Sequence, residues 1–359
     1  MVAKYLRLAN ILREQISSKI HTGDKKLPTE EVLSKRYGVS RQTVREALKV
    51  LKSEGLIETR QGSGTFIAMK NEGDLSKKIA VLISSDSDYI YPEMISDMKA
   101  TFKRNGYSTH VYVTNNSIST EREHLQSILT GRFAGLISEP VFNAYPGANI
   151  DIFEKIRDRG THILFIGGAY YNFPDFHRVK SDDVYGGYLA FRTLAKKNHK
   201  SIACLFNRDL MSGIERYQGV LMAANDFEAQ IRDDMCTWYS CEDVNRLRHN
   251  QDYSFLVEFL KENIKKVTAV ICMNDEIAYW LIKEARGLGY DVPEDFSVIS
   301  FDNSFLSMFD KLQITTVAHN AHEPAKSAAA GLVKLLKGQP FSSLKLSWHL
   351  ISRETDKSL

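Results

Sequence analysis

The stretch Tyr37-Gly38-Val39-Ser40-Arg41-Gln42-Thr43-Val44-Arg45-Glu46-Ala47-Leu48 decides how the first part of this 359-residue chain folds. Gly38 is typical of the position that follows a helix, and Ser40 is a good N-cap for the next one. Val44 and Leu48 then recur at helical spacing and predict a buried stripe. The stretch therefore predicts two helices joined by a short turn, with polar and basic residues at the start of the second.

The residues on either side of this stretch extend the pattern. Apolar residues at helical spacing predict a first helix over 5–20, and Thr29 predicts the N-cap of the helix that ends at Gly38. Downstream, two short strands enclose a glycine-rich tip that is typical of a hairpin. These segments are Leu56–Arg60, Gln61–Gly64 and Thr65–Ala68. Residues 1–69 are therefore predicted to form a winged helix-turn-helix, an α+β fold.

The charge of the chain is distributed unevenly. The formal net charge is only +3, but residues 1–70 carry 14 Lys and Arg against 7 Asp and Glu. The remaining residues carry 33 basic and 37 acidic side chains, a net charge of −4. A basic head on a mildly acidic body predicts a polyanionic partner for the head alone.

The start of the third helix has the chemistry of a DNA-reading surface. In helix-turn-helix proteins this end of the recognition helix meets base edges in the major groove. Arg binds guanine bidentately, Gln does the same with adenine, and hydroxyls and helix N-termini bind phosphate oxygens. The candidate residues here are Ser40, Arg41, Gln42, Thr43 and Arg45. The glycines at the tip of the hairpin would let the backbone approach a DNA strand closely.

These motifs resemble the DNA-binding domain of the gluconate-repressor (GntR) family. The matching stretches are Leu27–Glu30, Tyr37–Leu48, Glu54–Ile57 and Gln61–Ile67. The resemblance implies DNA contacts from Arg41, Thr43 and Arg45. It also implies contacts from the wing and from a basic residue of the first helix, which are Gln61, Gly62, Ser63, Gly64, Thr65 and Lys4, and we add Arg36 on the second helix. One position departs from the pattern, because Glu31 stands where many members carry Arg.

A polar segment, residues 70–78, is predicted to be a linker, and residues 79–359 are predicted to form the body. Apolar strands alternate with helical patterns along the body. The strand candidates are Ile79–Ser84, Thr109–Val113, Ala134–Ser138, His162–Ile166, Ser201–Phe206, Val267–Met273 and Phe296–Phe301. This alternation predicts doubly wound parallel α/β sheets, and the length of the body favours two lobes.

Polar and aromatic residues follow the predicted strand ends, where ligands of such folds bind. They are Tyr89, Tyr91, Glu139, Arg216, Asn274, Asp275, Asp302 and His319. Carboxylates, amides and guanidinium groups can bind sugar hydroxyls, while the C–H faces of a sugar pack on aromatic rings. The sequence thus predicts a sugar site.

The body resembles the periplasmic-binding-protein-like domain of the lactose/ribose repressor family. The matching stretches are Ser181–Gly187, Arg216–Gly219, Val270–Ala278, Val292–Asp302 and Thr315–Val317. The resemblance implies that Arg216, Asn274 and Asp302 contact the effector, with a polar ligand at the position of His319. Sugar binders of this family often have Asp or Asn followed by Arg after the strand that ends here at Ile166, but this chain has two glycines. We therefore add His177 as a candidate contact from that region.

The combination of such a head with such a body is similar to the arabinose-operon repressors of Gram-positive bacteria. The resemblance implies a homodimeric repressor that binds a near-palindromic operator and releases it when a sugar, with L-arabinose suspected, binds the body. One alternative has the same architecture but requires its small molecule as a co-repressor. Another is a sugar-binding enzyme or transport receptor fused to a DNA-binding head.

Other features of the sequence argue against several classes of protein. No apolar run approaches ~20 residues, so we expect no membrane span, and the charged N-terminus argues against secretion. The four cysteines form no metal or disulfide pattern, so we expect reduced thiols, no metal, no cofactor and a cytoplasmic protein. No nucleophile elbow or phosphate loop occurs, and Asp182 and Asp183 are expected to face opposite ways on a strand, so we expect no enzyme.

Overall fold

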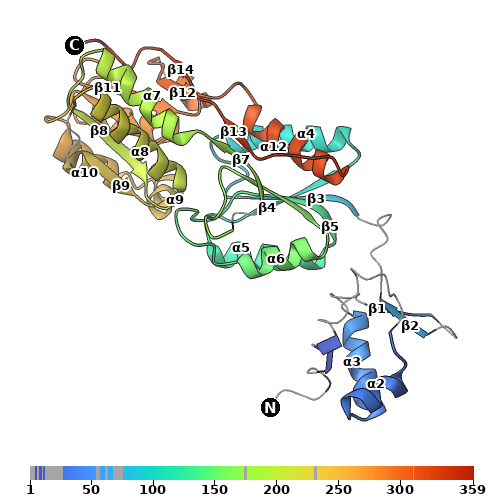
Figure 1. Ribbon diagram of the computed structural model, residues 1–359. Helices are drawn as coiled ribbons and strands as arrows, with labels where there is room; N and C mark the ends of the chain where they lie inside the picture. The colour runs from blue at the N-terminus through green and yellow to red at the C-terminus, as the bar shows by residue number, and fades with distance from the viewer. Residues whose placement is uncertain are drawn as a thin grey trace. The chain divides into compact units, whose positions relative to one another are not determined.

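The computed structural model describes residues 5, 8, 9, 11, 12, 27–53, 57–60, 64–67, 76–173, 176–229, 233–309 and 311–359. The chain divides into two compact units, Met1–Leu75 and Ser76–Leu359. We call them the head and the body and describe each by itself (Figure 1).

The head contains the two helices and the hairpin that the sequence predicts. Its elements are α2 (Glu30–Tyr37), α3 (Arg41–Ser53), β1 (Ile57–Arg60) and β2 (Gly64–Ile67). Thr29 caps α2, Gly38 ends it in the left-handed conformation, and the Ser40 hydroxyl accepts the Thr43 N–H at the start of α3. Most of the predicted first helix lies outside the described residues, although Leu8 and Leu12 belong to the head's core.

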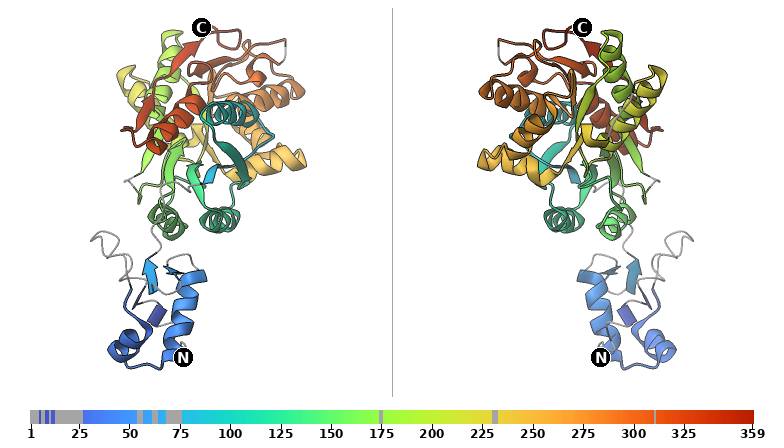
Figure 2. Two further views of the ribbon diagram at one scale, coloured as in Figure 1. Left: turned by 90° about the vertical axis from the view of Figure 1, so that its right-hand side faces the viewer. Right: turned by 90° about the vertical axis from the view of Figure 1, so that its left-hand side faces the viewer.

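The N-terminal lobe of the body is built on a six-stranded sheet in the order β13-β7-β6-β5-β3-β4, and all its neighbouring strands are parallel. The strands are β3 (Ser76–Ile83), β4 (Ser108–Val113), β5 (Phe133–Ser138), β6 (His162–Ile166), β7 (His177–Ser181) and β13 (Leu344–Leu346). The helices are α4 (Tyr91–Arg104), α5 (Ile118–Thr130), α6 (Ile150–Asp158) and α12 (Glu323–Leu336). The pair α5 and α6 covers one face of the sheet, and α4 and α12 cover the other (Figures 1 and 2). Each face has its own apolar cluster.

The C-terminal lobe repeats this plan with a sheet in the order β14-β12-β11-β10-β8-β9, in which only β14 is antiparallel to its neighbour. The strands are β8 (Ile202–Asn207), β9 (Cys236–Tyr239), β10 (Ala269–Cys272), β11 (Ser297–Phe301), β12 (Thr315–Ala318) and β14 (His349–Ile351). The helices are α7 (Asp183–Lys196), α8 (Met211–Asp226), α9 (Cys241–Asn250), α10 (Ser254–Asn263) and α11 (Asp275–Gly287), with 3-10 turns η1 (Asp233–Met235) and η2 (Phe305–Met308). Helices α7 and α8 pack closely together, as do α10 and α11.

The chain crosses between the lobes three times, after β7, after β12 and after β13. We call these crossings the hinge. At the hinge Asp182 N–H donates to the Leu346 carbonyl at 2.9 Å, and the Ser181 hydroxyl lies 2.7 Å from His319 Nε2. Residues that follow the carboxyl ends of strands in both lobes line one cleft, which includes Ser181 and His319 of the hinge.

The predicted fold class, a winged helix-turn-helix head and a doubly wound two-lobed body, is confirmed. Strand β3 begins at Ser76, inside the stretch 70–78 that the sequence predicts to be a linker. Asp182 and Asp183 were expected on a strand, and this is wrong. Asp182 caps α7 by accepting the Tyr185 N–H, and Asp183 is the first residue of that helix. No described helix has the length and apolar character needed to cross a membrane.

Candidate DNA-binding surface and effector cleft

The start of α3 presents its two arginines to solvent, each beside a glutamate of α2. Arg45 Nε donates to Glu30 Oε2 at 2.8 Å, and Arg41 lies 3.3 Å from Glu31. Both arginine side chains are 61% exposed. Exposed ion pairs of this kind contribute about 0–1 kcal/mol, so a phosphate or a guanine edge can replace either glutamate at little cost.

Some of the remaining head candidates lie within the described residues and some do not. The Ser40 hydroxyl caps the helix and lies 2.9 Å from the Thr43 hydroxyl, while Gln42 is exposed and its side-chain amide donates to Glu46 at 3.4 Å. Arg36 is exposed on α2. Gly64 and Thr65 begin β2, whereas Lys4, Gln61, Gly62 and Ser63 lie outside the described residues.

Two adjoining cavities occupy the cleft of the body. The small cavity, of about 210 Å³, is lined by Tyr89, Tyr91, Glu139, Arg216, Asn274 and Asp302 among others. The large cavity, of about 470 Å³, lies toward α4, α12 and the hinge and includes His319. Tyr91, Glu139, Arg216 and Asp302 line both. Of the nine predicted effector residues, the structure thus brings seven to the cleft, while Asp275 and His177 line neither cavity.

Arg216 is the central cation of the cleft. Its Nε donates to Asp183 at 2.8 Å, and its guanidinium also donates to the Met273 carbonyl. The Phe301 ring lies under the guanidinium at 4.0 Å, and Asp302 lies 4.0 Å from Nη2. The side chain is only 6% exposed, so packing and charge hold it in one orientation.

Asp302 directly follows β11 and has a φ of 96°, a backbone conformation that residues other than glycine rarely adopt. The Tyr89 hydroxyl, from the other lobe, donates to it at 2.8 Å and accepts the Asp275 N–H at 3.3 Å. Burial raises the pKa of the Asp302 carboxyl, although Arg216 and the Tyr89 hydrogen bond act in the opposite direction. A strained acceptor at a cleft is typical of a residue placed for a ligand.

The N-terminal lobe contributes a second hydrogen-bonded group to the cleft. The Ser84 hydroxyl donates to the Tyr91 hydroxyl at 2.5 Å, and Tyr91 donates to Glu139 at 2.9 Å. The second Glu139 oxygen accepts the Ser84 N–H at 2.8 Å. This wall therefore offers an aromatic ring together with hydroxyl and carboxylate acceptors, as a sugar requires.

The sequence reasoning missed one ion pair of the small cavity, Arg248 with Glu276. The two side chains form a bidentate pair at 2.8 and 2.6 Å, and Arg248 lies 4.0 Å from Asp88 of the other lobe. Glu276 could have been found, because it directly follows the predicted Asn274 and Asp275. Nothing in the sequence marked Arg248 as a site residue, because it stands among other charged residues at the end of α9.

Asn274 and its neighbour Asp275 have different roles. Asn274 lines the small cavity, and its side chain caps α11 by accepting the Ile277 N–H at 3.1 Å. Asp275 turns away from the cleft and is fully buried, where it accepts the Ser304 N–H at 2.6 Å and the Thr316 hydroxyl at 2.8 Å. Burial, with the nearby Asp302 charge, raises its pKa to about 7. Asp275 therefore joins the ends of strands β11 and β12 and does not face a ligand.

The two histidine candidates also differ. His319 stacks on Trp348 at the hinge, with ring centroids 3.6 Å apart, and burial lowers its pKa. His177 is the first residue of β7 and packs edge-on against Phe341. Because the cleft is at the carboxyl ends of the strands, the position of His177 at the opposite end of β7 removes it from the ligand set.

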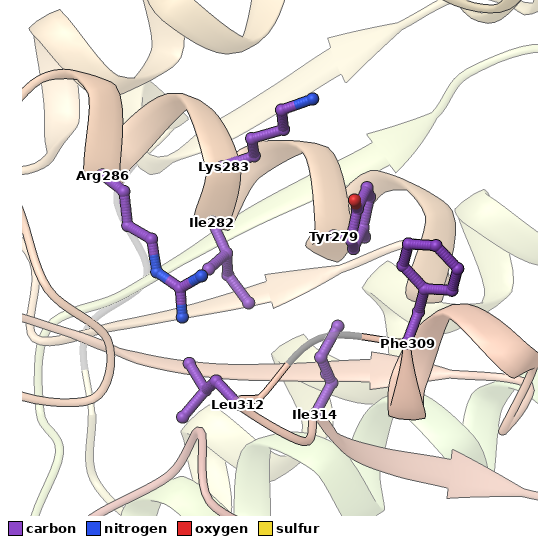
Figure 3. A pocket seen from close by; sticks show the side chains of 7 residues that line it. All are labelled: Tyr279, Ile282, Lys283, Arg286, Phe309, Leu312 and Ile314. Atoms are coloured by element: carbon purple, nitrogen blue, oxygen red, sulfur yellow. The ribbon is translucent and has the colours of Figure 1, made fainter.

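A separate surface pocket of about 210 Å³ lies on the outside of the C-terminal lobe. It is formed by the exposed side of α11 and the segment that precedes β12 (Figure 3). Its lining is Tyr279, Ile282, Lys283, Arg286, Phe309, Leu312 and Ile314. Phe309 is 66% exposed, which is unusual for so large an apolar side chain.

Comparisons with known proteins agree with the division of the chain into a head and a body. Residues 4–67 match the model of bacterial regulatory proteins of the gntR family, and residues 191–355 match that of a periplasmic binding protein-like domain. The chain is 31% identical over 338 residues to an arabinose metabolism transcriptional repressor of Halalkalibacterium halodurans, covering 91% of this chain and 89% of that protein. A protein of the same name from Geobacillus stearothermophilus is 30% identical over 338 residues, with coverages of 93% and 91%.

A solved structure supports the fold of the body. It is a periplasmic binding protein/LacI transcriptional regulator from Alkaliphilus metalliredigens, complexed with D-xylulofuranose. It matches with a TM-score of 0.64 and 19% identity, covering 78% of this chain and 99% of that one.

Proposed function

This chain belongs to the family of bacterial arabinose metabolism transcriptional repressors, and on that premise we propose that it represses genes for L-arabinose use until the sugar enters its cleft. It is a DNA-binding transcription regulator with a sugar-binding effector domain. The observation that carries the proposal is the pairing of Arg216 and Asp302 in a cleft of the body, in a chain whose head exposes Arg41 and Arg45.

The charges of the small cavity favour a neutral sugar as the effector. Arg216 is paired with Asp183, and Arg248 is paired with Glu276. Glu139 and Asp302 add further carboxylates, so a sugar phosphate or a sugar acid would meet net negative charge. A neutral pentose can donate its hydroxyls to these carboxylates and accept from the arginines.

The head and the body divide the work in this proposal. Arg45 and Arg41 read the operator, with Ser40, Gln42, Thr43, Arg36, Lys4 and the wing residues 61–65 supporting them. Tyr89, Tyr91, Glu139, Arg216, Asn274, Asp302 and His319 contact the sugar, and Asp275 positions the end of the strand that carries Asp302. The protein acts in the cytoplasm and performs no catalysis.

The protein works as a homodimer, which presents two heads to two half-sites of the operator. The apolar pocket beside Phe309 and Tyr279 supports a contact between two bodies, because exposed aromatic side chains of this size are typical of interfaces (Figure 3). Sugar binding closes the lobes, and the closed form binds operator more weakly by a coupling of ~1–3 kcal/mol.

A thermal-shift screen against pentoses, hexoses, their phosphates and purines tests the proposal. L-arabinose at a hundred times its Kd should stabilise the wild type by about 2.7 kcal/mol. The Asp302→Ala variant should fold but show no such shift. Stabilisation by a purine alone would instead favour a co-repressor and contradict the proposal.

A further inference from the structure

One pentose, which fits the small cavity, leaves most of the large cavity of the cleft unfilled. A cavity of ~150 Å³ holds a benzene ring, so the small cavity of about 210 Å³ already suits a single sugar ring. The large cavity, at about 470 Å³, is more than twice that size. The two adjoin, because Arg216, Asp302 and Tyr91 line both.

The walls of the large cavity alternate rings with hydrogen-bonding groups. Trp348 and Phe305 contribute aromatic side chains, and Phe305 is 56% exposed at the surface. His322, which directly precedes α12, and Asp97 of α4 contribute polar groups, joined by a 2.8 Å contact between Nδ1 and Oδ2. Rings that pack on C–H faces beside acceptors and donors are the chemistry of a carbohydrate site.

The charges of the large cavity also favour a neutral ligand. Lys180 Nζ is paired with Glu215 at 2.6 Å, so this cation is already neutralised. Asp97 and Glu93 both lie against His322, at 2.8 and 3.1 Å. The lysine and the arginine that line the large cavity, Lys180 and Arg216, both have carboxylate partners, which disfavours a phosphate there.

We infer that the large cavity is a second saccharide position, so the cleft accepts a disaccharide whose first ring lies in the small cavity against Arg216 and Asp302. This inference rests on the proposed function. The second ring lies between Trp348, Phe305 and the His322–Asp97 pair. The regulator then responds to a fragment of a pentose polymer as well as to the free pentose.

Calorimetric titration of the full chain with L-arabinose and with its 1→5-linked disaccharide tests the inference. Ala321 lines the large cavity only and is exposed, so Ala321→Trp should fill that cavity. The variant should bind the disaccharide more weakly than the wild type by about tenfold or more, a change of about 1.4 kcal/mol. Its affinity for L-arabinose should stay within about twofold of the wild-type value. Ala330→Trp, at an exposed position of α12, which begins two residues after Ala321, is the matched control and should change the affinity for neither sugar.

His322→Ala is a second variant, and it leaves the apolar core intact. It should also lower the affinity for the disaccharide and leave the affinity for L-arabinose unchanged. If the wild type binds L-arabinose but not the disaccharide, or if Ala321→Trp weakens both sugars equally, the second saccharide position is wrong. If the wild type binds neither sugar, the proposed function fails as well.

Discussion

Arg45 of the head and Arg216 of the body are both paired with a carboxylate at 2.8 Å, yet their surroundings differ sharply. Arg45 is 61% exposed and its partner Glu30 is 39% exposed. Arg216 and its partner Asp183 are 6% and 5% exposed. The head therefore holds its arginine in a replaceable pair, whereas the body holds its arginine in a fixed one. A residue that must exchange its partner for DNA needs the first arrangement, and a residue that must keep its orientation for a small ligand needs the second.

The largest effect should follow from removing the buried arginine. Arg216→Met leaves Asp183 unpaired in the interior, so the free energy of unfolding should fall by ~3–5 kcal/mol. Denaturant unfolding measures this loss, and L-arabinose binding should vanish as well. Adding Asp183→Asn should restore part of the stability without restoring sugar binding. A single variant as stable as the wild type would contradict the contrast between the two arginines.

The exposed arginine should affect binding and not stability. Arg45→Ala removes a predicted base contact, so operator affinity should fall by ~1–3 kcal/mol, about 5- to 150-fold. Fluorescence anisotropy with labelled operator measures this change, and the melting temperature should stay unchanged. Lys49→Ala, at an exposed position further along α3, is the control and should bind operator more nearly like the wild type.

The buried carboxyl of Asp275 should make the stability of the protein depend on pH. Its pKa is raised to about 7 by burial and by the nearby Asp302, so the folded state holds a proton that the unfolded chain releases near pH 4. The wild type should therefore lose stability relative to Asp275→Asn as the pH rises from 4 through 7, by about 1 kcal/mol or more. Asn can accept the Ser304 N–H and donate to the hydroxyls of Ser300 and Thr316, which suits it as a replacement. Thermal unfolding at pH 5 and pH 8 would show a constant difference if the carboxyl were charged throughout.

The smallest effect should come from the partner of the exposed arginine. Glu30→Gln removes the ion pair with Arg45 and should change the free energy of unfolding by less than ~0.5 kcal/mol. Asp183→Asn, the matched change in the buried pair, should cost several times more. Similar losses in the two variants would show that burial does not distinguish the pairs.

The sequence predicted the elements whose signals are local. The recognition helix follows from Gly38, Ser40 and the apolar stripe, and the buried strands β5, β8 and β11 follow from apolar runs. Strands β13 and β14 have three residues each and were missed, because so short a segment shows no periodicity. Strand β7 (His177–Ser181) was missed because Val179 is its only fully buried residue.

The candidate site was predicted where a side chain follows a strand end, as with Glu139, Asn274 and Asp302. The prediction was wrong where tertiary packing decides the direction of a side chain. Asp275 follows a strand in the same way but turns into the interior, since Ser300, Ser304 and Thr316 donate to it there. Spacing in the sequence cannot show those donors, which come from residues 25 or more positions away.

The central claim is that sugar binding in the body and DNA binding by the head oppose each other. Calorimetric titration of L-arabinose into the wild type, with and without saturating operator DNA, tests it most directly. Because coupling between two sites is reciprocal, operator should weaken the affinity for L-arabinose by about 5- to 150-fold, which corresponds to ~1–3 kcal/mol. Equal affinity in the two titrations would contradict the account, and tighter binding in the presence of operator would show that the sugar promotes repression.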